Sequence, residues 1–297
     1  METSPDIRKK ILFIVNPVSG TRKNRNLENR IASGLDPARF DHRISFTGEP
    51  GHSTQLAKKA VEEKMDIVVA VGGDGTVNEI GQALVDTEVL LGILPAGSGN
   101  GLARHLGIPL SVTRALGIIN RMKSIKMDTA VLNDKVFLSV AGIGYDAYVA
   151  KRFAALKHRG FLPYFRIVSG EYFRYKPRKY RIEIDGKILK RKAFLITFAN
   201  SGQFGYNTVI DPAARIDDGY IDVCIVRKIP FAILPLYLPL LYTKSFNKTR
   251  FIEIIPAKNV VIRRKKGKTI HFDGDPSSMG KELILNVKPL SLNVIVP

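Results

Sequence analysis

The stretch VVAVGGDGTVNEI, from Val68 to Ile80, decides the fold class. Its apolar start is a short run of the kind found in parallel strands that are buried on both faces. The glycines that follow let the backbone turn sharply and approach a ligand without a Cβ in the way. Thr76 and Glu79 have the spacing of a capping box, so we expect a helix to begin at Thr76. A helix N-terminus behind bare backbone predicts an anion site, most often for phosphate.

Two more apolar runs end in the same way. The run 11–15 is followed by NPVSG, Asn16 to Gly20, and the run 90–95 leads into PAGSGNGLARHLG, which ends at Gly107. If the strands are parallel, all three loops lie at the carboxyl edge of one sheet, where open α/β folds bind ligands. No lysine follows the glycines as in a Walker A loop. The three loops together predict a phosphate-bearing ligand of nucleotide size, met by backbone amides, metal and other basic residues.

After about Asp128 the pattern changes to short β-rich runs separated by Gly, Asn, Asp and Pro turns. Such runs are typical of an antiparallel sandwich. A basic stretch of helical character, roughly residues 148–175, is inserted near the start of this half. We therefore expect an open parallel α/β nucleotide-binding domain over residues 1–128 and a mainly antiparallel β-sandwich domain over 129–297. We also allow for the extreme C-terminus packing back on the first domain.

The composition is that of a folded protein of 297 residues, 45% hydrophobic and 25% charged. The single cysteine, Cys224, excludes an intramolecular disulfide and a Cys-rich metal site, and we expect it in the core. The N-terminus lacks the apolar stretch of a signal peptide. The longest apolar run, residues 229–242, is too short and too rich in proline to cross a membrane, so it is either a core helix or covering loop, or a membrane contact. We expect a cytoplasmic protein that associates peripherally with membranes.

Basic residues are in large excess. Lys and Arg number 46 against 27 Asp and Glu, a net charge of +19, which attracts either nucleic acid or anionic lipid. The sequence has no helix-turn-helix, RNP motif or zinc finger, so the hypothesis of nucleic-acid binding is supported by charge alone. Residues 151–192 carry 14 Lys and Arg against 3 Asp and Glu, with aromatic residues interleaved. This segment predicts electrostatic binding to an anionic membrane. A homodimer is the default expectation for the assembly.

The motifs NPVSG, GGDGTVNE and PAGSGNGLARHLGIP, in this order and at these distances, resemble the catalytic domain of the diacylglycerol kinase and sphingosine kinase family. The bacterial soluble lipid kinases are the most similar in length. The resemblance continues through MDTAVLNDKVFLSVAGIGYDA, PAARIDDGYIDV and FDGDP, so it covers nearly the whole chain. It implies an active site in the cleft between an α/β domain and a β-sandwich.

The resemblance also implies a reaction. The chain would transfer the γ-phosphoryl group of ATP, with Mg²⁺, to a hydroxyl of a diacylglycerol-like membrane lipid. A sphingoid-base kinase is an alternative, since PAGSGNGLA leans toward the sphingosine kinase branch. A kinase of a soluble acceptor is another, because NAD kinases share the GGDGT element. A basic nucleic-acid-binding protein is the remote alternative.

Site residues follow from the resemblance position by position. Thr47 matches only by its position before a Gly-containing helix start, and an ordinary turn threonine is its alternative. The residues that would contact ATP are Asn16, Pro17, Val18, Ser19, Gly20, Thr47, Gly73, Asp74, Gly75, Thr76, Val77, Asn78, Glu79 and Ser98.

Metal ligands are implied in two places. Asp74 would hold the Mg²⁺–phosphate complex, with support from Asp128, because Mg²⁺ prefers oxygen ligands. A second, structural metal would be bound by the Asp218 side chain and by the main-chain carbonyls of Arg215 and Tyr220. A plain Asp-Gly turn is the alternative for that loop.

The general base would be the last residue of the DGD motif, Asp275, where bacterial relatives carry glutamate. Its rival is Asp74, since the sphingosine kinase branch gives that role to the aspartate of the GGDG loop. A plain hairpin turn is the structural alternative for the Asp-Gly pair at Asp273.

Overall fold

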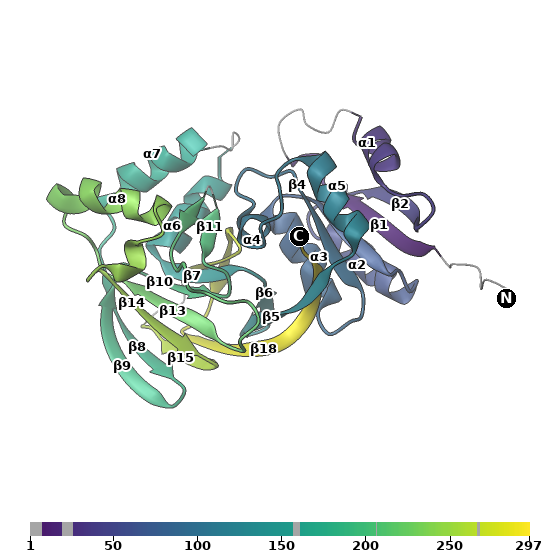
Figure 1. Cartoon of the computed structure of the whole chain (residues 1–297). Helices are drawn as coiled ribbons and strands as arrows, with labels where there is room; N and C mark the ends of the chain where they lie inside the picture. Colours follow the sequence, from purple (N-terminus) through teal and green to yellow (C-terminus); the bar gives the residue numbers. More distant parts are fainter. Residues whose placement is uncertain (1–7, 20–25, 157–160, 206, 266–267) are drawn as a thin grey trace. The chain divides into compact units, whose positions relative to one another are not determined.

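The computed structural model divides into two compact units, and residues near Asp128 mark the change from one to the other. No helix within the described residues is long and apolar enough to cross a membrane. The units are Met1–Met127 with Leu290–Pro297, and Asp128–Pro289. The structure describes residues 8–19, 26–156, 161–205, 207–265 and 268–297 (Figure 1).

The first unit is built on parallel strands in the order β2-β1-β3-β4. The predicted strands correspond to β1, β3 and β4, and their parallel pairing is confirmed. The sequence did not reveal β2, because FDHRISF lies at the edge of the sheet and most of its residues are at least partly exposed. The bounds are β1 Lys9–Val15, β2 Phe40–Phe46, β3 Ile67–Gly72 and β4 Leu90–Pro95.

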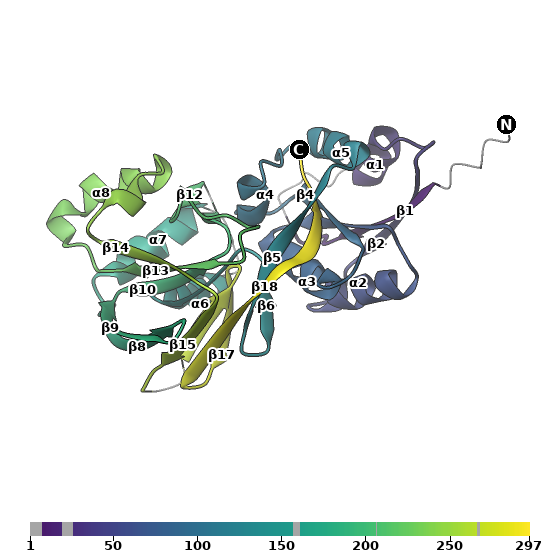
Figure 2. The same ribbon diagram turned by 60° about the horizontal axis from the view of Figure 1, so that its bottom comes forward.

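Helices cover both faces of this sheet, as Figures 1 and 2 show, with α1 beside α5 and α2 beside α3. Two covered faces explain why all six residues of β3 are buried and apolar or glycine. The helices are α1 Leu27–Gly34, α2 His52–Glu62, α3 Asp74–Leu84, α4 Gly101–His105 and α5 Val112–Arg121.

The second unit is a β-sandwich, as predicted. One sheet runs β14-β13-β10-β7-β16-β17 and the other includes β18-β15-β8-β9, with antiparallel pairing throughout these strands. Fully buried side chains from both sheets, such as Phe198 and Ile182, form its core, and Cys224 is buried as expected. The strands are β5 Ser124–Leu132, β6 Lys135–Phe137, β7 Val140–Gly144, β8 Arg178–Ile184, β9 Lys187–Ala193, β10 Leu195–Ala199, β11 Gln203–Gly205, β12 Thr208–Val209, β13 Ile221–Val226, β14 Ile252–Ala257, β15 Asn259–Arg263, β16 Lys268–Phe272, β17 Asp275–Met279 and β18 Glu282–Ile295.

The last strand differs from the expected pattern. Two of the short β-rich runs in the second half, LILNVK and LSLNVIVP, join into the single strand β18. Leu290 has φ of 48° and marks the point where the strand passes from the second unit into the first. Beyond it Val294 pairs in parallel with Leu91 of β4.

Helices accompany the sandwich. The predicted basic helical stretch corresponds to α6 and α7, and two of its aromatic residues, Tyr172 and Tyr175, are buried in a cluster with Phe194. The apolar run 229–242 forms η1 and α8. Some of their side chains pack against a core cluster, but none of the residues in these two helices is buried. The bounds are α6 Tyr145–Ala154, α7 Phe161–Tyr172, η1 Phe231–Ile233, α8 Leu234–Tyr242 and η2 Phe246–Lys248.

Candidate functional site

The loops after β1 and β3 are joined by side chains. Asn16 Nδ2 donates to Thr76 Oγ1 at 3.2 Å, and Asn16 Oδ1 accepts the N–H of Val18 at 3.1 Å. The main-chain N–H of Asn16 donates to the carbonyl of Val71 at 3.0 Å. Asn16 therefore fixes its own loop and links it to the GGDGT turn.

The other predicted residues of the NPVSG loop, and Thr47, follow the ends of β1 and β2. Ser19 donates its N–H to the carbonyl of Asn16 at 3.1 Å, closing a turn that contains Pro17. Gly20 lies outside the described residues. Thr47 directly follows β2, is buried, and donates its N–H to Val15 at 2.9 Å, so it lies at the same edge of the sheet.

The loops after β3 and β4 touch through their glycines. A Cβ added to Gly97 would lie 2.3 Å from the Cα of Gly73. The two loops can approach this closely because both positions are glycine. Asn100, with φ of 53°, clamps the turn: Gly97 N donates to its Oδ1 at 3.0 Å and its Nδ2 donates to the Gly97 carbonyl at 2.8 Å. Ser98 is exposed between them. Asn100 is not among the site residues predicted from the sequence, although asparagine is enriched at positive φ.

The helix after the GGDGT loop begins two residues before the predicted start. α3 begins at Asp74 with Gly73 as its N-cap in an extended conformation, and no side chain caps it. The capping box of Thr76 and Glu79 was therefore a wrong prediction. Thr76 is buried and bonded to Asn16, while a Cβ on Gly72 would lie 2.4 Å from its Oγ1, so packing holds this threonine.

The carboxylate of Asp74 faces the start of α4. Its Oδ1 accepts the N–H of Gly101 at 2.6 Å. Burial raises the pKa of Asp74 above its ordinary value, and hydrogen bonds from the main chain of Gly101, Asn100 and Leu102 oppose this rise. No ion pair to Asp74 occurs among the described residues. A carboxylate that is only partly exposed and has no cation beside it is suited to bind one.

The first turns of α3 hold the other predicted residues, including Gly75. The Oε1 of Glu79 accepts the N–H of Gly51 at 3.4 Å, and this ties α3 to the start of α2. Val77 is buried, so its side chain serves the core. The buried Oδ1 of Asn78, in the second turn of α3, has no hydrogen-bond partner among the described residues.

The remaining predicted residues belong to the second unit. Asp128 is fully buried and its Oδ2 accepts the N–H of Gly219 at 2.7 Å, so it fixes the predicted metal loop. In that loop Asp218 Oδ1 accepts the N–H of Tyr220 at 3.0 Å, and Arg215 pairs with Asp217 at 3.3 Å. In the part of the chain that the structure describes, no three His, Cys, Asp or Glu side chains cluster as a metal site.

The DGD motif forms a two-residue hairpin turn between β16 and β17. Asp273 and Gly274 have φ of 49° and 93°, and Phe272 pairs with Asp275 across the turn. Asp275 is exposed at the start of β17. The alternative of a hairpin is thus correct, and the hairpin presents the carboxylate that the resemblance names as the base.

Asp273 anchors this hairpin and was not assigned a role from the sequence. It is buried, and its two oxygens accept three successive main-chain N–H groups at 3.0, 2.9 and 2.7 Å, those of Leu138, Ser139 and Val140. Three such bonds hold a carboxylate firmly. The position of Asp275 therefore depends on residues more than a hundred positions earlier in the chain.

A second carboxylate, that of Asp146, is partly buried and lies against His271 of β16. Asp146 Oδ2 accepts the Thr197 hydroxyl at 3.0 Å and lies 3.2 Å from Nε2 of His271. A Cβ on Gly142 would lie 2.1 Å from Asp146 Oδ2, so the pair needs this glycine. The sequence analysis missed the pair because its members are 125 residues apart.

Comparison with known proteins agrees with this arrangement. Residues 10–132 match the model of the diacylglycerol kinase catalytic domain, and residues 139–296 match the YegS C-terminal NAD kinase beta sandwich-like domain. A diacylglycerol kinase of Staphylococcus carnosus is 26% identical over 290 residues, 95% of this chain and 94% of its own length. A diacylglycerol kinase of Staphylococcus saprophyticus is 27% identical with the same coverage.

A solved structure has the same fold. The crystal structure of a diacylglycerol kinase from Bacillus anthracis superposes with a TM-score of 0.75 at 23% identity and covers 97% of each chain. The two domain models together span nearly all of the present sequence. The chain therefore belongs to the diacylglycerol kinase catalytic-domain family and is a lipid kinase.

Proposed function

We propose that the protein transfers the γ-phosphoryl group of ATP to a hydroxyl of a diacylglycerol-like membrane lipid, with Mg²⁺. The observation that carries this proposal is the crossing of Gly73 and Gly97, which brings bare backbone from two strand ends together. The Staphylococcus relatives, named diacylglycerol kinases, support the choice of acceptor.

The nucleotide phosphates would lie against the loops at the carboxyl edge of the first sheet. Backbone N–H groups there would replace the lysine of a Walker A loop. The unpartnered Oδ1 of Asn78 and the exposed hydroxyl of Ser98 are further polar groups in the segments that follow β3 and β4. The residues predicted to contact ATP are thus proposed as one surface.

Asp74 would hold Mg²⁺. Its donor chemistry fits, because it offers carboxylate oxygen and one of its oxygens is already fixed by Gly101. Mg²⁺ is usually bound by one or two carboxylates, with waters and substrate phosphates completing the shell. When bound, the ion supplies positive charge to the phosphate oxygens.

The second metal would use Asp218 with the carbonyls of Arg215 and Tyr220. One carboxylate oxygen of Asp218 is engaged in its turn, which leaves the other for a hard cation such as Mg²⁺. Asp128 would support this loop through Gly219.

Asp275 would act as the general base. Its exposed carboxylate at the start of β17 is a group of the kind that can accept the proton of the acceptor hydroxyl. Asp74 is the rival, but its Oδ1 accepts the N–H of Gly101 and its carboxylate is the proposed ligand of Mg²⁺. Asp275→Glu, which restores the residue usual in bacterial relatives, should retain substantial activity.

The acceptor is tested by incubating the enzyme with labelled ATP and three acceptors in parallel: diacylglycerol in mixed micelles, sphingosine in mixed micelles, and NAD. We expect label in phosphatidate with Mg²⁺ present and little with EDTA. Label in sphingosine phosphate would move the chain to the sphingoid-base kinases. Turnover with NAD alone would contradict the lipid acceptor.

A further inference from the structure

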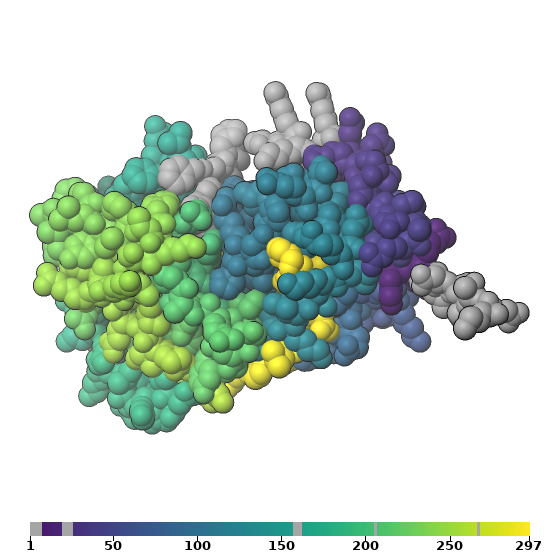
Figure 3. Space-filling model, viewed as in Figure 1, coloured from purple at the N-terminus to yellow at the C-terminus, as the bar shows by residue number. Residues whose placement is uncertain are grey.

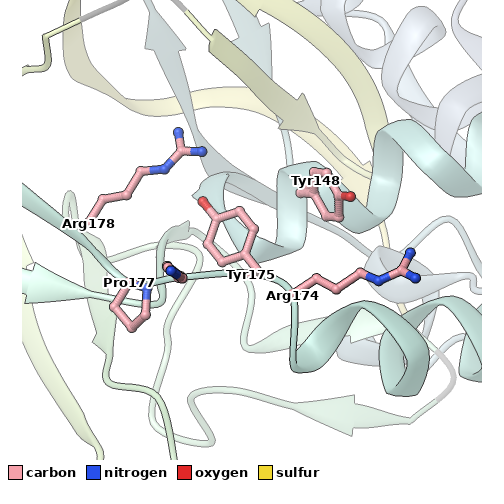
Figure 4. Close-up of a pocket in the computed structure, with 6 residues that line it drawn as sticks. Tyr148, Arg174, Tyr175, Pro177 and Arg178 are labelled. Carbon is pink, nitrogen blue, oxygen red and sulfur yellow. The ribbon is translucent and has the colours of Figure 1, made fainter.

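A cavity of about 400 Å³ opens in the second unit between α6 and the segment that joins α7 to β8. Figure 4 shows Arg174 and Arg178 extending on either side of Tyr175, with Tyr148 on the neighbouring helix. Lys176 and Pro177 complete its lining. None of these residues belongs to the phosphoryl-transfer machinery proposed above.

The floor of the cavity is firmly packed. Tyr175 is buried, and its ring lies 5.5 Å from the ring of Tyr148 and 5.6 Å from that of Phe194. Lys228 Nζ donates to the carbonyl of Tyr175 at 2.8 Å. A wall fixed by ring contacts and by a hydrogen bond is preformed for a ligand.

Positive charge exceeds negative charge around this cavity. The buried Glu171 accepts the Tyr148 hydroxyl at 3.0 Å and forms ion pairs with Arg152 at 3.3 Å and with Arg174 at 3.9 Å. Lys176 makes no ion pair within the described residues. Glu171 is therefore already satisfied by Tyr148, Arg152 and Arg174, and Lys176 remains available at the mouth.

The neighbouring charges strengthen this imbalance. Arg178 stacks its guanidinium 5.3 Å from the ring of Tyr175 and makes no ion pair among the residues that the structure describes. The charge of Arg178 also acts on Arg264. Burial lowers the pKa of Arg264, and the nearby charge of Arg178 lowers it further. The carboxylate of Asp146, whose charge acts on Tyr175, accepts the Thr197 hydroxyl and lies against His271. An anion that accepts hydrogen bonds would relieve this crowding of cations.

Exposed apolar side chains lie next to the basic cavity. Phe173, adjacent in sequence to Arg174, is 58% exposed, and its ring centroid lies 4.6 Å from that of Phe231, which is 59% exposed. Leu236 on α8 is 71% exposed. In Figure 3 the light green surface at the left is formed by η1, α8 and the residues that follow. A soluble anion would need the charge alone, whereas an amphiphile would use both features.

We propose that this cavity binds the phosphate of an anionic phospholipid headgroup, while Phe173, Phe231 and Leu236 enter the boundary between headgroups and acyl chains. The site is a recognition site on the membrane surface and carries out no chemistry. It replaces the diffuse attraction expected of the whole basic segment 151–192 by a defined headgroup contact made from a few of its residues.

The test is vesicle sedimentation without nucleotide or acceptor, so that a failure of the kinase proposal leaves it unaffected. The cavity variant is Lys176→Gln with Arg178→Gln. The matched control is Lys187→Gln with Lys190→Gln, exposed residues of β9 in the same basic segment. Each variant removes two positive charges, and vesicles are phosphatidylcholine with and without phosphatidylglycerol.

We expect the cavity variant to lose about tenfold in binding to the phosphatidylglycerol vesicles, the size of one lost charge-assisted hydrogen bond, while the control retains most binding. Equal losses in both variants would overturn the proposal in favour of diffuse charge. Calorimetry compares dihexanoyl phosphatidylglycerol with inorganic phosphate. The lipid should bind more tightly to the wild type and lose this advantage in Phe173→Ser. Equal binding of inorganic phosphate would identify a free phosphate site and overturn the lipid assignment.

Discussion

The two units hold their functional carboxylates by different means. Asp74 is fixed by residues within 27 positions of it in sequence, through Gly101 and the crossing of Gly73 and Gly97. The hairpin of Asp275 is fixed by Asp273, which accepts N–H groups 133 to 135 positions away. The arrangement around Asp74 depends on residues close together in sequence. The arrangement around Asp275 depends on distant residues that meet only in the folded sandwich.

The largest effect is expected for Asp74→Asn. The asparagine oxygen can still accept the N–H of Gly101, so the loop should persist, but the charge that would bind Mg²⁺ is lost. We expect turnover to fall by about 10³-fold or more, in line with the loss of a preorganised electrostatic group. Circular dichroism and turnover, measured on one preparation, check that the variant is folded and that its activity is lost. Turnover like that of the wild type would remove Asp74 from the site.

A smaller loss is expected for Gly97→Ala. The added Cβ would lie 2.3 Å from the Cα of Gly73, so the two loops must separate and the phosphate surface is displaced. We expect kcat/KM to fall by about 10²-fold, the usual result of a shift near 1 Å.

Gly117→Ala is the matched control, because a Cβ there meets nothing within 4 Å and the residue lies inside α5. It should stabilise the helix by about 0.5–1 kcal/mol and leave kcat/KM unchanged. Thermal melting and kinetics of the two variants distinguish the effect of displacing the loops from the general effect of replacing a glycine by alanine. Equal activity in both would remove the crossing from the account.

The smallest effect concerns the pH dependence of stability in the second unit. Burial, the charge of Asp211 and a hydrogen bond from it raise the pKa of Asp222 to about 7 from 3.8. Because the folded state binds this proton more tightly, stability falls as the pH rises from about 4 to about 7. Asp222→Asn removes the titrating group and should raise Tm at pH 8 by a few degrees, with no gain near pH 4.

Thermal melts at both pH values check this, with Asp217→Asn as the control because Asp217 is exposed and pairs with Arg215. A gain in Tm that is the same at both pH values would contradict the raised pKa of Asp222.

The glycine loops could be predicted because each depends on residue types a few positions apart. The sequence therefore predicted the strand ends and their parallel pairing, and the phosphate site at that edge of the sheet stays a prediction. It gave the wrong start for α3, since Thr76 is held by Asn16, which lies 60 positions away, rather than by a cap. The strand β2 was missed because an edge strand with polar residues has no apolar signature.

The supports of the second unit could not be predicted from spacing. Asp273 appeared only as part of a turn, although its contacts with the chain before β7 hold the hairpin. The pair of Asp146 and His271 likewise depends on tertiary packing. Family resemblance named Asp275 and Asp218, and the fold shows what holds each of them.

The division of roles between the units is tested most directly by measuring ATP affinity and the single-turnover rate of phosphoryl transfer in Asp275→Asn. The account predicts ATP affinity close to that of the wild type and a rate lower by about 10²–10⁴-fold, the usual contribution of a general base. Loss of ATP affinity with an unchanged rate at saturation would contradict it. That result would assign Asp275 to nucleotide or metal binding and return the base role to Asp74.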